Sequence, residues 1–351
     1  MRKGGGRVKE EQRIRNGTID LLRGIAILMV LMQHTISVST QKAEETLFFD
    51  VIWSLQMPMF FLVSGYVSKF SRVISDGKEL AVSMKRKTKA YLYPWIVWTV
   101  LIRGLLLGEK SFLDFSSLIY RMDAGYWFLF SLWMITLVFG TSQYLSCRFF
   151  KKASEFSYVM YLAVFYIAGM VLFAAAALWK GLSFLGMKLT MYYMPFFFAG
   201  FLWNWIDLWT AGYQWKQKVI QIAVLTGGVL WIVLLIRFDF YSMADTLGGI
   251  IVRAVASLAG CVFVSGLLSR KGNCGKVGDI LQKVGKHSLE LYLIHHLVLA
   301  PIRLPEAPVF MTAVGLGLTV VNYTFTVGVC LVLVKVVNRN SKVKMALFGR
   351  N

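Results

Sequence analysis

Cysteine and histidine are scarce in this chain, with four of each among 351 residues. Cys147, Cys261, Cys274 and Cys330 show no paired spacing, which argues against a disulfide framework and against a cysteine zinc site. Acidic residues are also few: 18 Asp and Glu stand against 38 Lys and Arg, for a formal net charge of +20. The chain also lacks a polar segment of domain size, so we expect no soluble domain between its apolar stretches.

Hydrophobic residues make up 57% of the chain, and its mean hydropathy is +0.61. Apolar stretches of about 20 residues recur from end to end, and a helix of that length spans a bilayer. Short segments of alternating polarity, which a transmembrane β-barrel needs, are few. The sequence therefore predicts an all-α integral membrane protein, a bundle of about ten transmembrane helices. These spans are expected near residues 18–37, 47–68, 91–108, 125–146, 156–178, 190–206, 218–236, 246–268, 288–304 and 309–334.

The excess of basic residues follows this topology. With both termini in the cytoplasm, most of the 38 Lys and Arg fall in inner segments, as the positive-inside rule requires. Topology and attraction to membrane lipids account for the charge, and we expect no nucleic-acid partner. We predict a basic cytoplasmic N-tail at 1–17, one multi-pass membrane domain at 18–336 and a basic cytoplasmic C-tail at 337–351.

Arg23 and His34 are the most informative pair in the first apolar stretch, because ionisable groups at membrane depth are costly and mark functional sites. Three helical turns separate them, so they share one helix face with about 16 Å between them along the axis. Imidazole is the usual general base near neutral pH, which makes His34 the candidate catalytic residue. Asp20 precedes Arg23 by one turn, but no carboxylate in the sequence is clearly placed to orient the ring of His34.

The second span carries a proline and three further notable residues. Pro58 bends the helix and frees a backbone carbonyl, which is tolerated beside a cavity. Gln56 is placed to hydrogen-bond His34 or a substrate hydroxyl. Ser64 and Gly65 permit close helix packing, and Ser64 is alternatively a residue of the donor site.

Two sets of cations lie outside the first span. Arg86 and Lys89, in a basic run, are either an inner-face anchor or a clamp for phosphate oxygens. Arg253 lies too deep in the eighth span for its side chain to reach the surface comfortably. A pair with Asp245 or Asp20 would explain it structurally, and contact with an anionic or carbonyl group would explain it functionally.

Three of the four histidines lie between residues 287 and 296. Zinc sites on a helix favour His at i and i+4 with a carboxylate on the same face, and His287, His295 and His296 do not have that spacing, so we expect no metal. Tyr292 and His295 are one turn apart and are expected to line a polar cavity. Trp127 is either part of an aromatic belt or a platform for a sugar ring.

The order of these motifs resembles the bacterial membrane acyltransferase-3 family, most closely its fucose 4-O-acetylase-like branch, from residue 16 to about residue 300. The ordered set is Arg-x10-His at 23–34, Met-Pro-Met-Phe-Phe-Leu-Val-Ser-Gly-Tyr at 57–66, Arg-x-x-Lys at 86–89, Trp-Phe-Leu at 127–129, Met-Pro-Phe-Phe-Phe-Ala-Gly at 194–200 and Tyr-Leu-Ile-His at 292–295. One departure is Gln56, where many relatives of this branch have a histidine. If that histidine takes part in proton transfer in those relatives, Gln56 cannot do so here.

The resemblance implies transfer of an acetyl group from cytoplasmic acetyl-CoA to a hydroxyl of an extracytoplasmic or lipid-linked glycan, at the inner membrane of a bacterial cell. Acetyl-CoA would be a substrate, with no tightly bound cofactor. By motif position, Arg23, Arg86 and Lys89 would hold the CoA phosphates, and His34 would be the general base.

The remaining roles are hypotheses from the residues themselves. Gln56 or Arg253 would stabilise the oxyanion, and Trp127, Tyr292 and His295 would contact the acceptor. A transporter of a glycan or lipid-linked intermediate is the alternative class, because broken helices and buried polar groups suit it too. No inverted repeat is visible, which counts against that alternative.

Overall fold

The computed structural model describes residues 4–122, 125–150, 154–210, 212–213, 215–243, 245–271, 275–304 and 306–350, with side chains described from residue 17 onward except at 270–271. All regular elements in these ranges are helices, and the one β-contact among them is an isolated bridge between Gln41 and Val309. The predicted all-α fold is confirmed.

The chain divides into two compact units, each described here by itself. Unit 1 comprises Met1–Tyr66 and Leu202–Val336, and unit 2 comprises Val67–Phe201 and Val337–Asn351. Residues 337–351, predicted as a tail, thus belong to unit 2.

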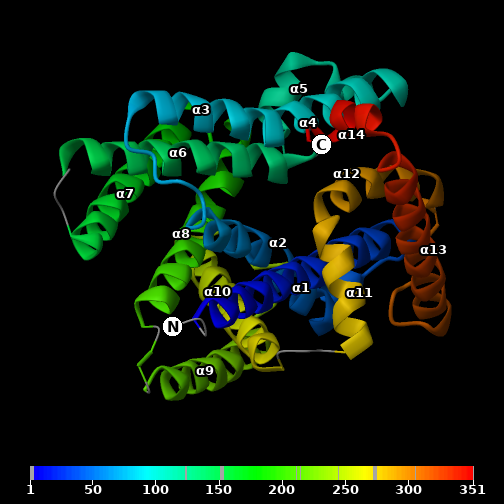
Figure 1. Cartoon of the computed structure of the whole chain (residues 1–351). Helices are drawn as coiled ribbons and strands as arrows, with labels where there is room; N and C mark the ends of the chain where they lie inside the picture. The colour runs from blue at the N-terminus through cyan, green and yellow to red at the C-terminus, as the bar shows by residue number, and fades with distance from the viewer. Residues whose placement is uncertain are drawn as a thin grey trace. The chain divides into compact units, whose positions relative to one another are not determined.

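Unit 1 contains the helices from the N-terminal and C-terminal parts of the predicted membrane domain (Figure 1). They are α1 Gly4–Ser39, η1 Ala43–Glu45, α2 Leu47–Ser68, α9 Lys216–Arg237, α10 Leu247–Lys271, α11 Gly275–Lys286, α12 Ser288–Leu299, η7 Ala300–Ile302 and α13 Ala313–Val337. Helix α2 runs on into unit 2 for its last two residues. Helix α1 begins at Gly4, so most of the predicted N-tail at 1–17 is helical.

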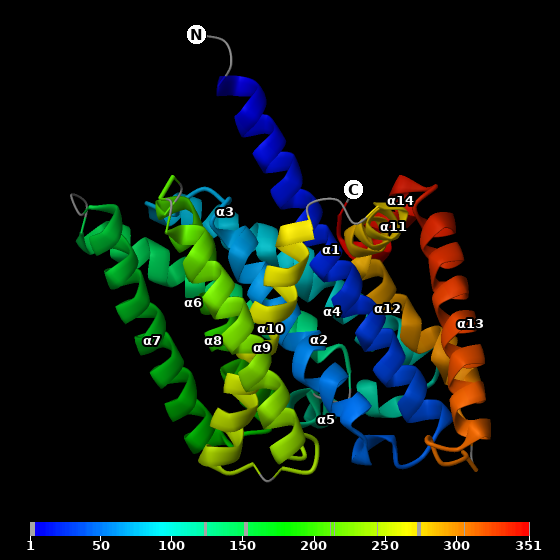
Figure 2. The ribbon, with the colours of Figure 1, turned by 90° about the horizontal axis from the view of Figure 1, so that it is seen from below.

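Helices α11, α12 and α13 lie beside α1, as Figure 2 shows. Two glycines bring α1 and α11 together: a Cβ at Gly24 would overlap the carbonyl oxygen of Leu281, and one at Gly285 would overlap that of Asp20. Small residues allow this kind of backbone approach between membrane helices. On α13, the Tyr323 hydroxyl donates to the Leu28 carbonyl of α1 at 3.2 Å. Helix α1 therefore packs closely against α11 and is hydrogen-bonded to α13.

Unit 2 contains the middle of the chain and its C-terminal helix. Its elements are α3 Gly77–Lys87, η2 Thr88–Leu92, α4 Tyr93–Ile96, η3 Val97–Leu106, η4 Lys110–Phe112, α5 Phe115–Tyr120, α6 Trp127–Phe149, α7 Glu155–Lys180, η6 Phe184–Gly186, α8 Met187–Trp209 and α14 Ser341–Phe348. Helix α8 continues into unit 1 after Phe201. The segments η2 and η3 are π-helical, a form that is often found near functional sites.

Helix α14 docks on this π-helical region. Phe348 is fully buried and stacks on Trp98, with ring centroids 6.0 Å apart and planes 9° apart. The Trp98 indole donates to the Leu347 carbonyl at 2.8 Å, and the Tyr93 hydroxyl donates to the Ala346 carbonyl at 3.0 Å. The predicted basic C-tail therefore contains a packed helix.

Each of the ten ranges predicted as spans is mostly helical in the structure, although some of their end residues, such as 107–108, 303–304 and 309–312, lie outside the helices. Among the described residues, seven helices are long and apolar enough to cross a membrane: Gly17–Ser39, Leu47–Ser68, Trp127–Phe149, Glu155–Lys180, Lys216–Arg237, Leu247–Ser269 and Ala313–Val337. The other three ranges correspond to the mixed π- and α-helical stretch at 88–106, to α8 and to the shorter apolar helix Ser288–Ile302. A multi-pass membrane protein is confirmed, while the count of ten and the cytoplasmic termini stay predictions.

Candidate functional site

Three of the four histidines of the chain meet in unit 1. His34 of α1 lies against His295 and His296 of α12, with ring centroids 5.0 and 4.9 Å away. The rings of His295 and His296 are 4.1 Å apart. His295 is fully buried, and the other two are partly exposed. We call these three residues the imidazole cluster.

Tyr292 extends the imidazole cluster along α12. It is buried, and its ring centroid lies 5.8 Å from that of His295. Tyr292 and His295 are thus neighbours, while the polar cavity that they are expected to line stays a prediction. The position of His295 beside His34 could not be read from spacing, because α1 and α12 lie near opposite ends of the chain.

Arg23 occupies the same continuous helix as His34. Its guanidinium Nη1 lies 3.6 Å from the Asp20 carboxylate, and 31% of its side chain is exposed. Lys286, at the end of α11, is close enough to Asp20 for electrostatic attraction. Because α11 is seated on α1 by the two glycine contacts, Arg23 and Lys286 gather around the Asp20 carboxylate. Cations grouped in this way can hold an anionic ligand.

Gln56 and Ser64 lie on α2 in unit 1. Gln56 is 4% exposed, and its side-chain oxygen has no hydrogen-bond partner among the residues that the structure describes. Such a buried acceptor is suited to a hydroxyl donor. Ser64 is half-buried. Its neighbour Gly65 is buried.

Arg253, on α10, is held by the loop that precedes this helix. Its Nη2 pairs with the Asp245 carboxylate at 2.6 Å, and its Nη1 donates to the Met243 carbonyl at 3.1 Å. Of the explanations that the sequence left open, the structure shows the pair with Asp245.

Arg86 and Lys89 lie in unit 2, where α3 ends and η2 begins, and both are exposed. Helix α3 starts with a side-chain cap, because the Asp76 carboxylate accepts from the Glu79 amide at 2.8 Å. Hydrogen bonds from the backbone and hydroxyl of Ser75 hold the pKa of the Glu79 carboxyl below its usual value. The cap fixes the start of the helix, whose last turn presents the basic run.

Trp127 begins α6 and stacks on Tyr193 of α8, with centroids 5.4 Å apart and planes 21° apart. Next to it, Tyr126 is fully buried. Packing within unit 2 thus accounts for the orientation of Trp127 and Tyr193.

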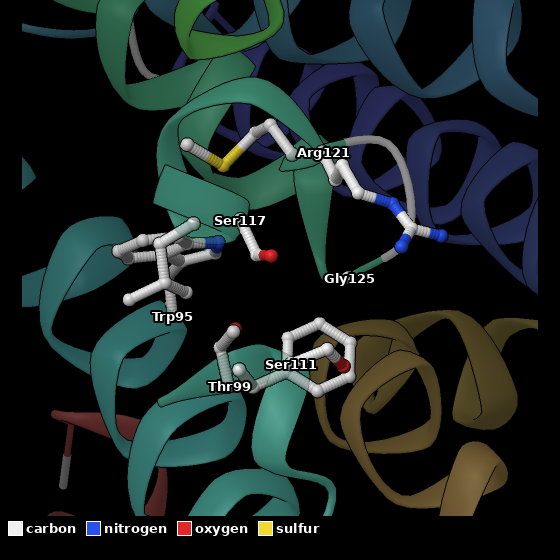
Figure 3. Close-up of a pocket in the computed structure, with 9 residues that line it drawn as sticks. Trp95, Thr99, Ser111, Ser117, Arg121 and Gly125 are labelled. Atoms are coloured by element: carbon white, nitrogen blue, oxygen red, sulfur yellow. The ribbon is translucent and has the colours of Figure 1, made fainter. Parts of the chain in front are cut away.

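A small pocket in unit 2 was not foreseen from the sequence. Figure 3 shows the polar atoms of Trp95, Thr99 and Ser117 turned into it, with Arg121 at its rim. The Trp95 indole nitrogen and the Thr99 hydroxyl are buried and have no hydrogen-bond partner among the described residues. The volume of about 30 Å³ suits a hydroxyl or a water molecule and is too small for a sugar ring.

Comparison with known proteins identifies the family. The family model described as "Acyltransferase domain" (Acyl_transf_3) matches residues 16–335. The Nodulation protein NolL of Sinorhizobium fredii (strain NBRC 101917 / NGR234) is 24% identical over 154 residues, which cover 38% of this chain and 38% of that protein. No solved structure matches the chain. The long family match together with the apolar helices shows that this chain is a multi-pass membrane protein of the acyltransferase-3 family.

Proposed function

We propose that this protein is an O-acetyltransferase of the bacterial inner membrane. It moves the acetyl group of cytoplasmic acetyl-CoA to a hydroxyl of an extracytoplasmic or lipid-linked glycan. Membership of an acyltransferase family supports the general class of reaction. The observation that carries the specific proposal is that one helix, α1, holds both Arg23 and His34, with His34 beside two imidazoles of α12.

The donor end of the proposed site is Arg23. Its guanidinium would bind a phosphate of CoA through charge-assisted hydrogen bonds. The pantetheine arm is comparable in length to the separation of about 16 Å between Arg23 and His34 on the helix, so it would bring the thioester close to His34. In unit 2, the exposed Arg86 and Lys89 are proposed as further phosphate-binding cations.

The proposed reaction is a direct acyl transfer. The acceptor hydroxyl gives its proton to His34 while its oxygen attacks the thioester carbonyl carbon. The C–S bond then breaks, and the CoA thiolate leaves and takes up the proton from His34. A two-step route through an acyl group on His34 or Ser64 is the alternative, and it would yield an acetylated enzyme that can be trapped without acceptor.

Groups around the reacting atoms complete the proposal. Gln56 or Arg253 would stabilise the oxyanion, and Gln56 is favoured because Arg253 is paired with Asp245. Tyr292 and His295 would contact the acceptor, since His295 adjoins His34 and Tyr292 adjoins His295. Trp127 is proposed as a stacking platform for the sugar ring.

The test is turnover of acetyl-CoA by the purified protein in detergent. With radiolabelled acetyl-CoA and a polysaccharide or lipid-linked acceptor, we expect label on the acceptor and release of free CoA. A transporter would consume no acetyl-CoA, so the absence of both products would reject the proposal. Mass spectrometry of surface polysaccharide, with and without the gene, would then identify the acceptor sugar.

A further inference from the structure

The imidazole cluster has the composition and spacing of a metal-ligand set. Each of His34, His295 and His296 offers one ring nitrogen, and these nitrogens all lie within 4.8 Å of one another. Three histidines with an open fourth position are a known ligand set for zinc, with Zn–N distances of about 2.0–2.1 Å. Tetrahedral geometry at those distances puts ligand nitrogens about 3.4 Å apart. Modest rotation of the rings would therefore close the set around an ion.

The spacing of the histidines along α12 alone gave no reason to expect a metal site. His295 and His296 are adjacent, and the sequence supplies no third ligand on the same helix face. The third ligand comes from α1, where His34 follows a different stretch of the chain. Convergence of three of only four histidines is thus a property of the packing of α1 on α12.

The surroundings suit a reversible site for a transition metal. The cluster contains only imidazoles, which prefer zinc, copper or nickel to magnesium or calcium. His34 and His296 are partly exposed, so the protein does not enclose the cluster completely, while His295 is fully buried. Because the deep ligand is fixed by packing, the cluster can capture an ion without a large rearrangement of the backbone.

We propose that the imidazole cluster binds Zn²⁺ reversibly and that the bound ion inhibits the enzyme. A nitrogen of His34 that is coordinated to zinc has no lone pair left to accept a proton. The inhibitory part of this inference depends on the proposed role of His34 as a base, whereas the metal site depends on geometry alone. Acetyl transfer itself needs no resident metal in this account.

The binding test uses the full chain, purified in detergent through an affinity tag without histidines and treated with EDTA. We expect one Zn²⁺ per chain by elemental analysis after equilibration with micromolar zinc, and visible Co²⁺ absorption typical of tetrahedral coordination. His296→Gln should weaken zinc binding at least about tenfold, because one ligand is lost. His287→Gln is the matched control, since His287 lies beside Glu290 at 3.8 Å and outside the cluster.

His296 is chosen for substitution because it is partly exposed, whereas a change at the buried His295 risks misfolding. Retained zinc binding in His296→Gln, or no binding by the wild-type protein, would overturn the metal site. The inhibition test adds zinc to the transfer assay, where we expect loss of activity that EDTA reverses. Activation by zinc, or no effect at concentrations that fill the site, would overturn the inhibitory role. If no acetyl transfer is found at all, the function proposed above fails while the binding measurements still decide the metal site.

Discussion

The imidazole rings of His34 and His295 lie 5.0 Å apart between centroids and are tilted by 41°, although one belongs to α1 and the other to α12. The contact gives His34 a buried polar neighbour. The sequence offers no obvious carboxylate that could orient the ring of His34. Hydrogen bonding and packing by neighbours are what hold a catalytic imidazole in a productive orientation. The proposed base is therefore supported by another histidine.

Replacement of His34 by alanine should lower kcat for acetyl transfer by about 10²- to 10⁴-fold, the usual contribution of a general base. The KM for acetyl-CoA should change little, because the phosphate-binding cations are untouched. His287→Ala is the control, and it should keep wild-type kinetics. Wild-type turnover by a folded His34→Ala protein would reject the assignment.

Replacement of Arg86 or Lys89 by alanine should raise the KM for acetyl-CoA about tenfold with little effect on kcat. The reason is that one charge-assisted hydrogen bond to phosphate contributes about 1.5–3 kcal/mol. Steady-state kinetics at low and high salt measure the effect, which salt should reduce in the wild-type protein. Lys78→Ala, also exposed on α3, is the matched control. Equal KM values for the wild-type protein and the three variants would show that the basic run is only an inner-face anchor.

Replacement of Gly285 by alanine should lower the Tm in detergent, because the new Cβ would overlap the Asp20 carbonyl oxygen and force α11 away from α1. Overpacking of this kind costs about 1–3 kcal/mol. Gly317→Ala provides the control within unit 1, since a Cβ there meets nothing within 4 Å. A Tm for Gly285→Ala as high as that of the control would show that α11 does not rest on α1 as described.

Replacement of Thr99 by valine should leave the Tm unchanged or raise it. The Thr99 hydroxyl is buried without a partner among the described residues, so its removal ends a desolvation cost. Thr190→Val should instead destabilise by about 1 kcal/mol, because it removes a buried hydrogen bond. In the structure, the Thr190 hydroxyl donates to Ser131 at 3.0 Å. Destabilisation by Thr99→Val to the same extent would show that the small pocket holds a bound group that uses the hydroxyl.

Much of the secondary structure could be predicted from the sequence. A helix in a bilayer satisfies its own backbone hydrogen bonds, so a long apolar run is enough to predict it. For the same reason, the shared face of Arg23 and His34 followed from the helical period alone. The π-helical turns at Thr88–Leu92 and Val97–Leu106 could not be predicted, because they depend on local packing and not on composition.

Two contacts show where prediction from sequence ended. The pair of Arg253 with Asp245 was one of several possible pairings, and only the loop before α10 selected it. The docking of Phe348 on Trp98 was missed, because a short basic C-terminal segment gives no sign of a partner for one buried ring.

By itself, the sequence determined that this is a helical membrane protein and that one face of its first helix carries a cation and an imidazole. Both conclusions depend on local periodicity and on the cost of placing charge in a bilayer. Only the tertiary structure decided that His295 and His296 meet His34 and that α11 brings Lys286 close to Asp20 of α1. Contacts between distant helices depend on side-chain packing in three dimensions, and a single sequence does not encode that packing in any local pattern.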